Sequence, residues 1–405
     1  MLGNLSWKNI WRNKLRSSTV IAAVALGVFA GVFMIALMNG MIDSRLQAII
    51  HTEISSIQIH NPEFLANSDF SRRIPDADKV VQRVNEMDHV ISVSKRLVIT
   101  SMIASAKANT GVKILGVTPD MERKVTNICD KMIEGSYFNS NKKNAIVIGK
   151  KLAEKLKIGL NKKVVITLQD ANMNITGGAF RVVGIYETDN SLFDESTVYV
   201  RYNDLCALTG LNTTEVHEIA VMIDKDSNSG LIRNVLKFNF PELDIQDWTQ
   251  LSPEAGYLIS AMNQYLYIFV LVIMLALCFG IVNTMLMAVL ERVKELGMLM
   301  AIGMNKIRIF FMLMLETLYL SITGGFIGII LGYFLCRYLG KTGLNLYFWE
   351  EAYKSIGYSS VIYPEIDLNM IAFTALMVVL TGIFSTLYPA YKALKLNPAD
   401  ATRTK

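Results

Sequence analysis

Four long stretches of this chain are almost free of charge. Residues 17–42, 255–290 and 368–391 contain no Asp, Glu, Lys or Arg, and residues 309–336 contain only Glu316. Each stretch exceeds the roughly 20 residues that a helix needs to cross about 30 Å of hydrocarbon. The pattern therefore predicts a membrane protein with four transmembrane α-helices at these ranges.

A large polar segment, residues 43–254, separates the first two predicted spans. Its pattern mixes β-like runs with helical pieces, which indicates an α+β domain. Asn172, Asn174, Gly177 and Gly178 together predict a hairpin turn near its centre. The expected strands cover 54–59, 90–100, 164–168, 180–186 and 197–200, and the expected helices cover 77–87 and 150–156. Only a short loop, residues 337–367, separates the third and fourth spans.

Residues 1–16 precede the first span and predict an amphipathic helix. Trp7, Trp11 and Leu15 recur every four residues, with basic residues beside them. Such a helix is expected to lie in the membrane interface, with its cations on lipid phosphates.

Composition agrees with the span pattern and adds an orientation. The 405 residues are 52% hydrophobic and 19% charged, whereas soluble domains carry about 25% charged residues. Twelve Lys or Arg residues and three acids, a net charge of +9, lie in residues 1–16, the loop 291–308 and the tail 392–405. The formal net charge of the whole chain is +5, so all other residues together carry −4. The positive-inside rule therefore predicts cytoplasmic termini and an extracytoplasmic domain at 43–254, and the basic charge does not indicate nucleic-acid binding.

Signatures of catalysis or metal binding are not found in the sequence. The four histidines are scattered, and neither a zinc helix nor a nucleophile elbow is present. Gly340-Lys341-Thr342 is not preceded by the glycine that a phosphate-binding loop requires. Cys129 and Cys206 both fall in the outer domain, where a disulfide and two free thiols remain equally open. We therefore expect neither an enzyme nor a metal site.

Within the spans, one acid and several small residues stand out. Glu316 is an intramembrane carboxylate, for which we favour pairing with a basic residue such as Arg308 over a proton or substrate role. Small residues spaced by four would let another helix approach closely, either within the chain or in a dimer. They are Gly27 and Gly31 in the first span, and Gly324, Gly328 and Gly332 in the third.

The loop at 291–308 is the most informative stretch. It predicts a short amphipathic helix with Val293, Leu296 and Met300 on one side and four charged residues on the other, closed by Gly303. The charged residues are Glu291, Arg292, Lys294 and Glu295. A surface helix that only ties two spans together would have this pattern, and so would a helix that docks a cytoplasmic partner.

The same loop resembles the coupling segment of the FtsX-like permeases of ABC transporters, the group that includes MacB and LolC/LolE. The resemblance rests on Glu291, Arg292, Glu295, Leu296, Gly297, Ala301, Ile302 and Gly303. It continues through Glu316 and the glycines of the third span to the tail YPAYKALKLNPADATR at 388–403. The order of one span, a large outer domain and three more spans is also similar.

Membership in this family would imply a non-catalytic permease subunit that binds no cofactor. ATP and Mg would belong to a separate cytoplasmic ATPase dimer, contacted by the loop and the tail. A second permease subunit, identical or paralogous, would complete the complex, and residues 106–214 would form a subdomain inserted between porter-like ends.

The outer domain begins in a way that resembles the LolC/LolE type, so we expect release of lipoproteins from the inner membrane, with a periplasmic carrier as a further partner. Efflux of small molecules or peptides, as in MacB, and mechanical signalling to a periplasmic enzyme, as in FtsX, remain alternatives. A membrane enzyme with its site in the outer domain is disfavoured by the absent catalytic signatures.

Overall fold

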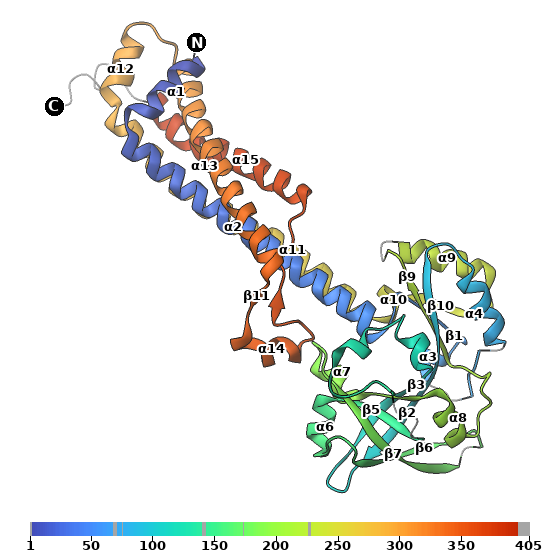
Figure 1. Ribbon diagram of the computed structural model, residues 1–405. Helices are drawn as coiled ribbons and strands as arrows, with labels where there is room; N and C mark the ends of the chain where they lie inside the picture. The colour runs from blue at the N-terminus through green and yellow to red at the C-terminus, as the bar shows by residue number, and fades with distance from the viewer. Residues whose placement is uncertain are drawn as a thin grey trace. The chain divides into compact units, whose positions relative to one another are not determined.

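The computed structural model describes residues 2–67, 71–74, 76–139, 143–172, 174–225 and 228–395. The chain forms two compact units (Figure 1). The helical unit comprises 1–42, 259–345 and the chain from Val361 onward. The α/β unit comprises Asp43–Leu258 together with Leu346–Ser360.

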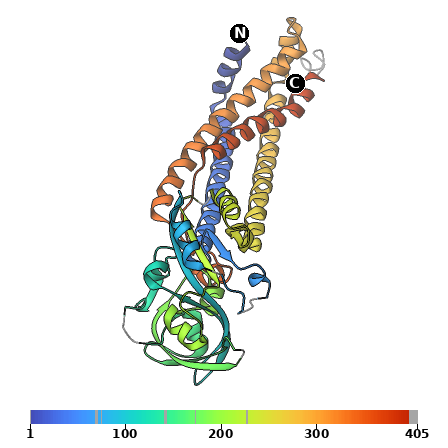
Figure 2. The ribbon, with the colours of Figure 1, turned by 90° about the vertical axis from the view of Figure 1, so that its right-hand side faces the viewer.

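In the described part of the chain, four helices are long and apolar enough to cross a membrane, which confirms the prediction of four spans with a large domain between the first two. These are the segments Lys14–Glu53, Gly256–Glu291, Lys306–Thr342 and Leu368–Leu394. Figure 2 shows the long helices running alongside one another. The helices of this part of the chain are α1 (Leu2–Arg12), α2 (Lys14–Ala48), α11 (Pro253–Glu291), α12 (Val293–Ala301), α13 (Lys306–Thr342) and α15 (Leu368–Leu394).

The N-terminal helix is shorter than the expected 1–16. Helix α1 ends at Arg12, Asn13 forms a bend, and α2 begins at Lys14. The Ser17 hydroxyl donates a hydrogen bond of 2.5 Å to the Ile10 carbonyl across this bend. The stripe of Trp7, Trp11 and Leu15 is therefore divided between two helices, because the chain bends before Leu15.

The glycines of α13 pack against α2 within the chain. A Cβ added at Gly328 would lie 2.6 Å from the Ala25 carbonyl oxygen, and one at Gly324 would lie 2.8 Å from Val24. Gly332 faces Val32 in the same way, whereas Gly27 faces Leu277 of α11. Gly31 has no atom within 4 Å of such a Cβ. The stripe on α13 therefore serves intrachain packing, one of the two uses that the spacing allowed.

The α/β unit is built on a ten-stranded mixed sheet in the order β10-β1-β9-β2-β3-β8-β5-β7-β4, with β6 pairing β2 and β7. Strand pairs β3/β8 and β5/β7 are parallel and the others are antiparallel. The strands are β1 (Ile57–His60), β2 (Val90–Ala104), β3 (Asn109–Val117), β4 (Met132–Gly135), β5 (Ala145–Gly149), β6 (Lys163–Gln169), β7 (Ile175–Tyr186), β8 (Thr197–Arg201), β9 (Glu218–Ile223) and β10 (Asp244–Asp247).

Helices and short turns accompany this sheet, and the longer ones bury one face. In α4, the buried residues Ala77, Val80, Val81 and Val84 repeat at helical spacing. The helical elements of the unit are η1 (Ile49–Glu53), α3 (Phe64–Asn67), α4 (Ala77–Asn85), α5 (Pro119–Glu122), η2 (Ile128–Lys131), α6 (Lys150–Leu156), α7 (Ser191–Ser196), α8 (Tyr202–Thr209), α9 (Ser229–Asn239), α10 (Trp248–Leu251), η4 (Tyr347–Trp349) and α14 (Glu350–Ser355).

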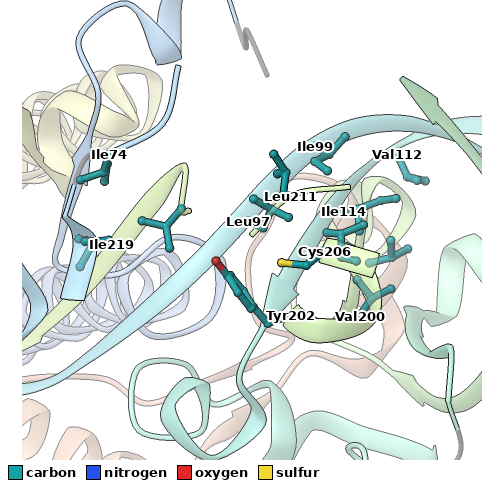
Figure 3. Packing of buried hydrophobic residues seen from close by; sticks show 14 of the residues in the cluster. Ile74, Leu97, Ile99, Val112, Ile114, Val200, Tyr202, Cys206, Leu211 and Ile219 are labelled. Atoms are coloured by element: carbon teal, nitrogen blue, oxygen red, sulfur yellow. The ribbon is translucent and has the colours of Figure 1, made fainter. Parts of the chain in front are cut away.

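Strand β2 joins the two ends of the α/β unit to its middle. Its first half pairs with β9, while its second half pairs with β3 and β6. One hydrophobic cluster continues on both sides of it, and Figure 3 shows Leu97 of β2 between Ile219 and Ile114. Residues 106 and 214, the expected limits of an inserted subdomain, lie in connections between elements, and the inserted subdomain stays a prediction.

The prediction that Gly177 and Gly178 belong to the hairpin turn is wrong. The turn lies at 170–174, where the Asp170 carboxylate accepts 2.8 Å hydrogen bonds from the backbone amides of Asn172 and Asn174. Gly177 and Gly178 belong to β7 and pair with Thr167 and Ile166 of β6. The turn lies before the two glycines because the Asp170 carboxylate binds the backbone amides that follow it.

A charge cluster that the sequence did not reveal is buried in the α/β unit. Arg96 of β2 is 1% exposed and donates to both oxygens of Glu122, at 2.6 and 3.1 Å. It also donates to Glu218 at 2.7 Å and to the Ile54 carbonyl at 2.8 Å. Burial alone would raise the pKa of Glu218, but the Arg96 guanidinium lowers this pKa well below its usual range. The cluster fixes three segments that are distant in sequence.

Cys129 and Cys206 of the α/β unit are free thiols in this structure. Cys206 lies in α8, where burial raises its pKa to about 11. A thiol with this pKa is a poor nucleophile at neutral pH, because little thiolate is present.

Candidate functional site

Helix α12 is a separate short helix between α11 and α13, as the loop pattern predicted. It is preceded by Arg292 and followed by Ile302 and Gly303. Gly303 has a φ of +100°, which a residue with a side chain rarely adopts. The Asn305 side chain then accepts a 3.1 Å hydrogen bond from the Ile307 amide and begins α13. The end of α12 and the start of α13 are thus fixed by local chemistry.

One face of α12 is packed into the end of the helical unit. Leu296 is buried in a cluster with residues of α11, α13 and α15, and Gly297 beside it is also buried. Val293 and Met300, which were expected to share this face, are half-buried. The other members of the cluster are Val289, Ile309, Met312, Leu313, Ala390 and Ala393.

The opposite face of α12 is exposed and partly apolar. Lys294 and Glu295 are exposed as expected, and so are Ala301 and Gly303. Met298 and Ile302 are also exposed, by 57% and 79%, and they stand one turn apart. Met298 was not among the predicted site residues, although it lies four residues before Ile302 in the sequence. An exposed surface that mixes Met and Ile with charges is typical of a protein contact.

Arg292 differs from the other charged residues of the loop because it points inward. Its side chain is 11% exposed and its Nη1 lies 3.4 Å from Oε2 of Glu316 on α13. Asn9 of α1 donates a 2.8 Å hydrogen bond to Oε1 of Glu316, and Arg292 Nη2 donates to the Asn9 carbonyl at 3.2 Å. Three helical segments therefore meet at one buried carboxylate.

Glu316 pairs with a basic residue, as expected, but this residue is Arg292 and not Arg308. Arg308 lies eight residues before Glu316, about 12 Å along the same helix, and its side chain is exposed. Arg292 reaches Glu316 because the turn between α11 and α12 brings it against α13. The role of Asn9 was not visible, since an asparagine in a basic helix carries no signal for a contact 307 residues away.

Two ion pairs, each with at least one exposed side chain, also connect α12 and the last residue of α11 to the N-terminal segment. Arg12 pairs with Glu295, and Arg16 lies 3.4 Å from Glu291. Between these groups lies a cavity of about 360 Å³ whose walls include Asn9, Leu299 and Glu316. Exposed pairs of this kind contribute little stability on their own, so the buried carboxylate is the main connection.

Helix α1 packs against α13 near this carboxylate. The Ser6 hydroxyl donates to the Met312 carbonyl at 3.2 Å, and the Trp7 and Tyr319 rings meet edge to face at 5.7 Å. Trp7 and Trp11 remain 43% and 48% exposed. Contact of these rings with lipid stays a prediction.

The tail motif is described only in part. Residues 388–395 close α15, and Lys306 donates a 3.0 Å hydrogen bond to the Leu394 carbonyl. Residues 396–405, with the rest of the tail motif, lie outside the described residues. In the described part of the chain, no group of His, Cys, Asp and Glu residues could hold a metal ion.

The fold and this site define a membrane protein that joins four spans to a large domain between the first two. A model of the MacB-like periplasmic core domain matches residues 17–237, and a model of the FtsX-like permease C-terminal region matches residues 267–398. The chain therefore belongs to the ABC transporter permeases of the MacB/FtsX/LolC family.

Several proteins of this family are similar to the chain. The lipoprotein-releasing system transmembrane protein LolC of Neisseria meningitidis is 24% identical over 75% of this chain and 75% of its own length. The corresponding LolE of Haemophilus influenzae is 22% identical over 90% of this chain and 89% of its own length. The macrolide export ATP-binding/permease protein MacB of Rhodopirellula baltica is 31% identical over 39% of this chain and 21% of its own length.

Two solved structures are similar to part of the chain. The extracellular domain of the noncanonic ABC-type transporter YknZ from Gram-positive bacteria covers 47% of this chain and 99% of its own, with 18% identity and a TM-score of 0.34. The periplasmic region of MacB from Actinobacillus actinomycetemcomitans covers 52% of this chain and 95% of its own, with 14% identity and a TM-score of 0.36.

Proposed function

We propose that this permease releases lipoproteins from the inner membrane, driven by a separate cytoplasmic ATPase. The similarity to the LolC and LolE proteins extends over 75% and 90% of the chain, whereas that to the MacB protein extends over 39%. ATP and Mg would be bound by the ATPase dimer. A second permease chain, identical or paralogous, would complete the membrane part.

The distribution of charge supports an orientation with both termini in the cytoplasm. Residues 1–16, 291–308 and 392–405 hold the excess of Lys and Arg, and such segments remain on the cytoplasmic side. The α/β unit would then be periplasmic, where it would receive the lipoprotein and pass it to a carrier.

The coupling role is supported by the difference between the two sides of α12. Met298 and Ile302 on one side are exposed to solvent, while Arg292, just before the helix, forms an ion pair with Glu316 on α13. A push on the exposed face would therefore be transmitted to α13 and, through Asn9, to α1. The proposed contact residues are Glu291, Lys294, Glu295, Met298, Ala301 and Ile302, with Arg292, Leu296, Gly297 and Gly303 holding the helix in place.

Depletion of the chain tests the cargo. Lipoproteins destined for the outer membrane should accumulate in the inner membrane fraction, while outer-membrane proteins without acyl chains should sort normally. Normal lipoprotein sorting after depletion would contradict release. Loss of resistance to exported compounds would then support a MacB-like efflux role, and loss of activity of a periplasmic enzyme would support an FtsX-like signalling role.

A further inference from the structure

A groove in the α/β unit contains none of the residues proposed for coupling. One wall is formed by residues 346–355 of the loop between α13 and α15, and the other by α6 and α7. Its volume is about 950 Å³. Figure 1 shows α14 beside α7.

The loop wall presents three consecutive aromatic side chains to solvent. Tyr347, Phe348 and Trp349 are 76%, 89% and 58% exposed, and the rings of Phe348 and Trp349 meet edge to face at 5.5 Å. Leu192 of α7, which is 66% exposed, stands on the opposite wall. Exposed aromatic groups gathered around a concave surface indicate a binding site, because they keep apolar area in contact with water.

The aromatic wall is held in position by the domain. Lys354 of α14 lies 2.8 Å from Glu187, which follows β7, and 2.8 Å from Glu350. Gly357, with a φ of +79°, lies against the Arg45 guanidinium so closely that an added Cβ would be 2.8 Å from Cζ. The groove is thus a preformed feature, which lowers the entropic cost of binding.

The groove carries an excess of negative charge. Its walls contain five carboxylates and three lysines. The lysines are engaged with carboxylates of the walls, and Lys155 from outside the groove pairs with Glu195. Among the described residues, the exposed Glu351 carboxylate has no ion pair or hydrogen bond. It lies two residues after Trp349, so one anion and two aromatic rings are available to a ligand.

We propose that this groove binds a positively charged segment of a partner protein on the side of the membrane where the α/β unit lies. A lysine or arginine of the partner would contact the faces of Phe348 and Trp349 and pair with Glu351, because aromatic rings and carboxylates both attract cations. A basic side chain of a polypeptide can supply such a cation. A membrane surface fits the groove less well, because its lipid phosphates would be repelled by the excess of carboxylates.

Photo-crosslinking in living cells tests the proposal. Phe348 is replaced by p-benzoylphenylalanine in the full-length protein, and the adducts are digested and identified by mass spectrometry. We expect an adduct with one other protein, joined at a segment that contains lysine or arginine. An adduct with lipid, with a second copy of this chain, or with a segment lacking basic residues would overturn the proposal, as would the absence of an adduct.

A charge reversal makes the test specific. In the crosslinking variant, Glu351→Lys should lower the adduct yield roughly tenfold, as expected from replacing a charge attraction by a repulsion, while Glu351→Asp should retain most of it. Glu242→Lys, at an exposed acid outside the groove, is the matched control and should leave the yield unchanged. Equal yields in the two reversed variants would contradict a role of Glu351. The measurement does not depend on lipoprotein sorting, so its outcome is separate from that of the proposed function.

Discussion

Arg292 and Glu316 form a buried ion pair, with 3.4 Å between Nη1 and Oε2, although the residues are 24 positions apart and in different helical segments. The pair joins the turn before α12 to the first third of α13, and Asn9 connects it to α1. In the proposed mechanism, this is the point where a displacement of α12 reaches the spans.

Removing one residue of this ion pair should lower the stability of the protein more than removing both residues. Glu316→Ala leaves the Arg292 charge buried without compensation, which typically costs about 3 kcal/mol or more. Arg292→Met combined with Glu316→Gln should recover part of that loss. Thermal unfolding of the purified protein measures both effects. As a control, Glu291→Gln, whose side chain is 59% exposed, should change stability by less than about 1 kcal/mol.

The two glycine stripes offer a matched pair of substitutions. Gly328→Ala places a Cβ 2.6 Å from the Ala25 carbonyl oxygen, so we expect a loss of roughly 1–3 kcal/mol from overpacking. Gly31→Ala meets no atom within 4 Å and should be neutral or slightly stabilising, since alanine favours the helix. Unfolding temperatures of the two variants give the comparison. Equal effects would contradict the close approach of α13 to α2.

The Arg96 cluster should be essential for the α/β unit. Arg96→Met leaves Glu122 and Glu218 buried without a counter-charge, and we expect a loss of about 3–5 kcal/mol. The control is Asp224→Asn, which removes an exposed pair with His89 whose side chains are 57% and 38% exposed; its effect should stay below about 1 kcal/mol. Limited proteolysis of the domain between α2 and α11 reports the difference, and equal resistance of both variants would contradict the role of Arg96.

Asp194 should make stability depend on pH. Burial raises its pKa from 3.8 to about 6, although hydrogen bonds from Thr188 oppose this shift. Between about pH 4 and 6 the folded protein therefore holds a proton that the unfolded chain has lost. The contribution of Asp194 to the free energy of unfolding falls as pH rises through this window, by up to about 3 kcal/mol.

Asp194→Asn removes this titration. The free energy of unfolding of the parent, relative to that of the variant, should decrease from pH 4 to pH 7. Denaturant unfolding at several pH values measures it. A constant difference between the two proteins would show that the Asp194 carboxyl is not perturbed.

Sequence alone predicted the features that depend on local pattern. Stretches without charge located the four spans, and Gly303 marked the end of α12 because a left-handed residue is a local requirement. The partner of Glu316 could not be predicted, since Arg292 reaches it only through the turn between two helices. The same holds for Arg96, Glu122 and Glu218, which are far apart in sequence and meet only in the folded sheet.

Glu295 offers a way to separate its two possible roles. It pairs with Arg12 within the chain and is proposed to contact the ATPase. Glu295→Arg should weaken ATPase binding. Adding Arg12→Glu restores an internal pair with the charges exchanged. If Glu295 contacts the ATPase, the double variant should co-purify with no more ATPase than the Glu295→Arg variant does. Co-purification of the double variant at the level of the parent would show that Glu295 only positions α1.

We propose that this permease works with a separate ATPase to release lipoproteins. Purification of the intact complex from native membranes, followed by mass spectrometry of every component, tests this proposal. We expect a second permease chain, a separate cytoplasmic ATPase and acylated proteins in the same complex. A complex that contains neither the ATPase nor lipoproteins would contradict it.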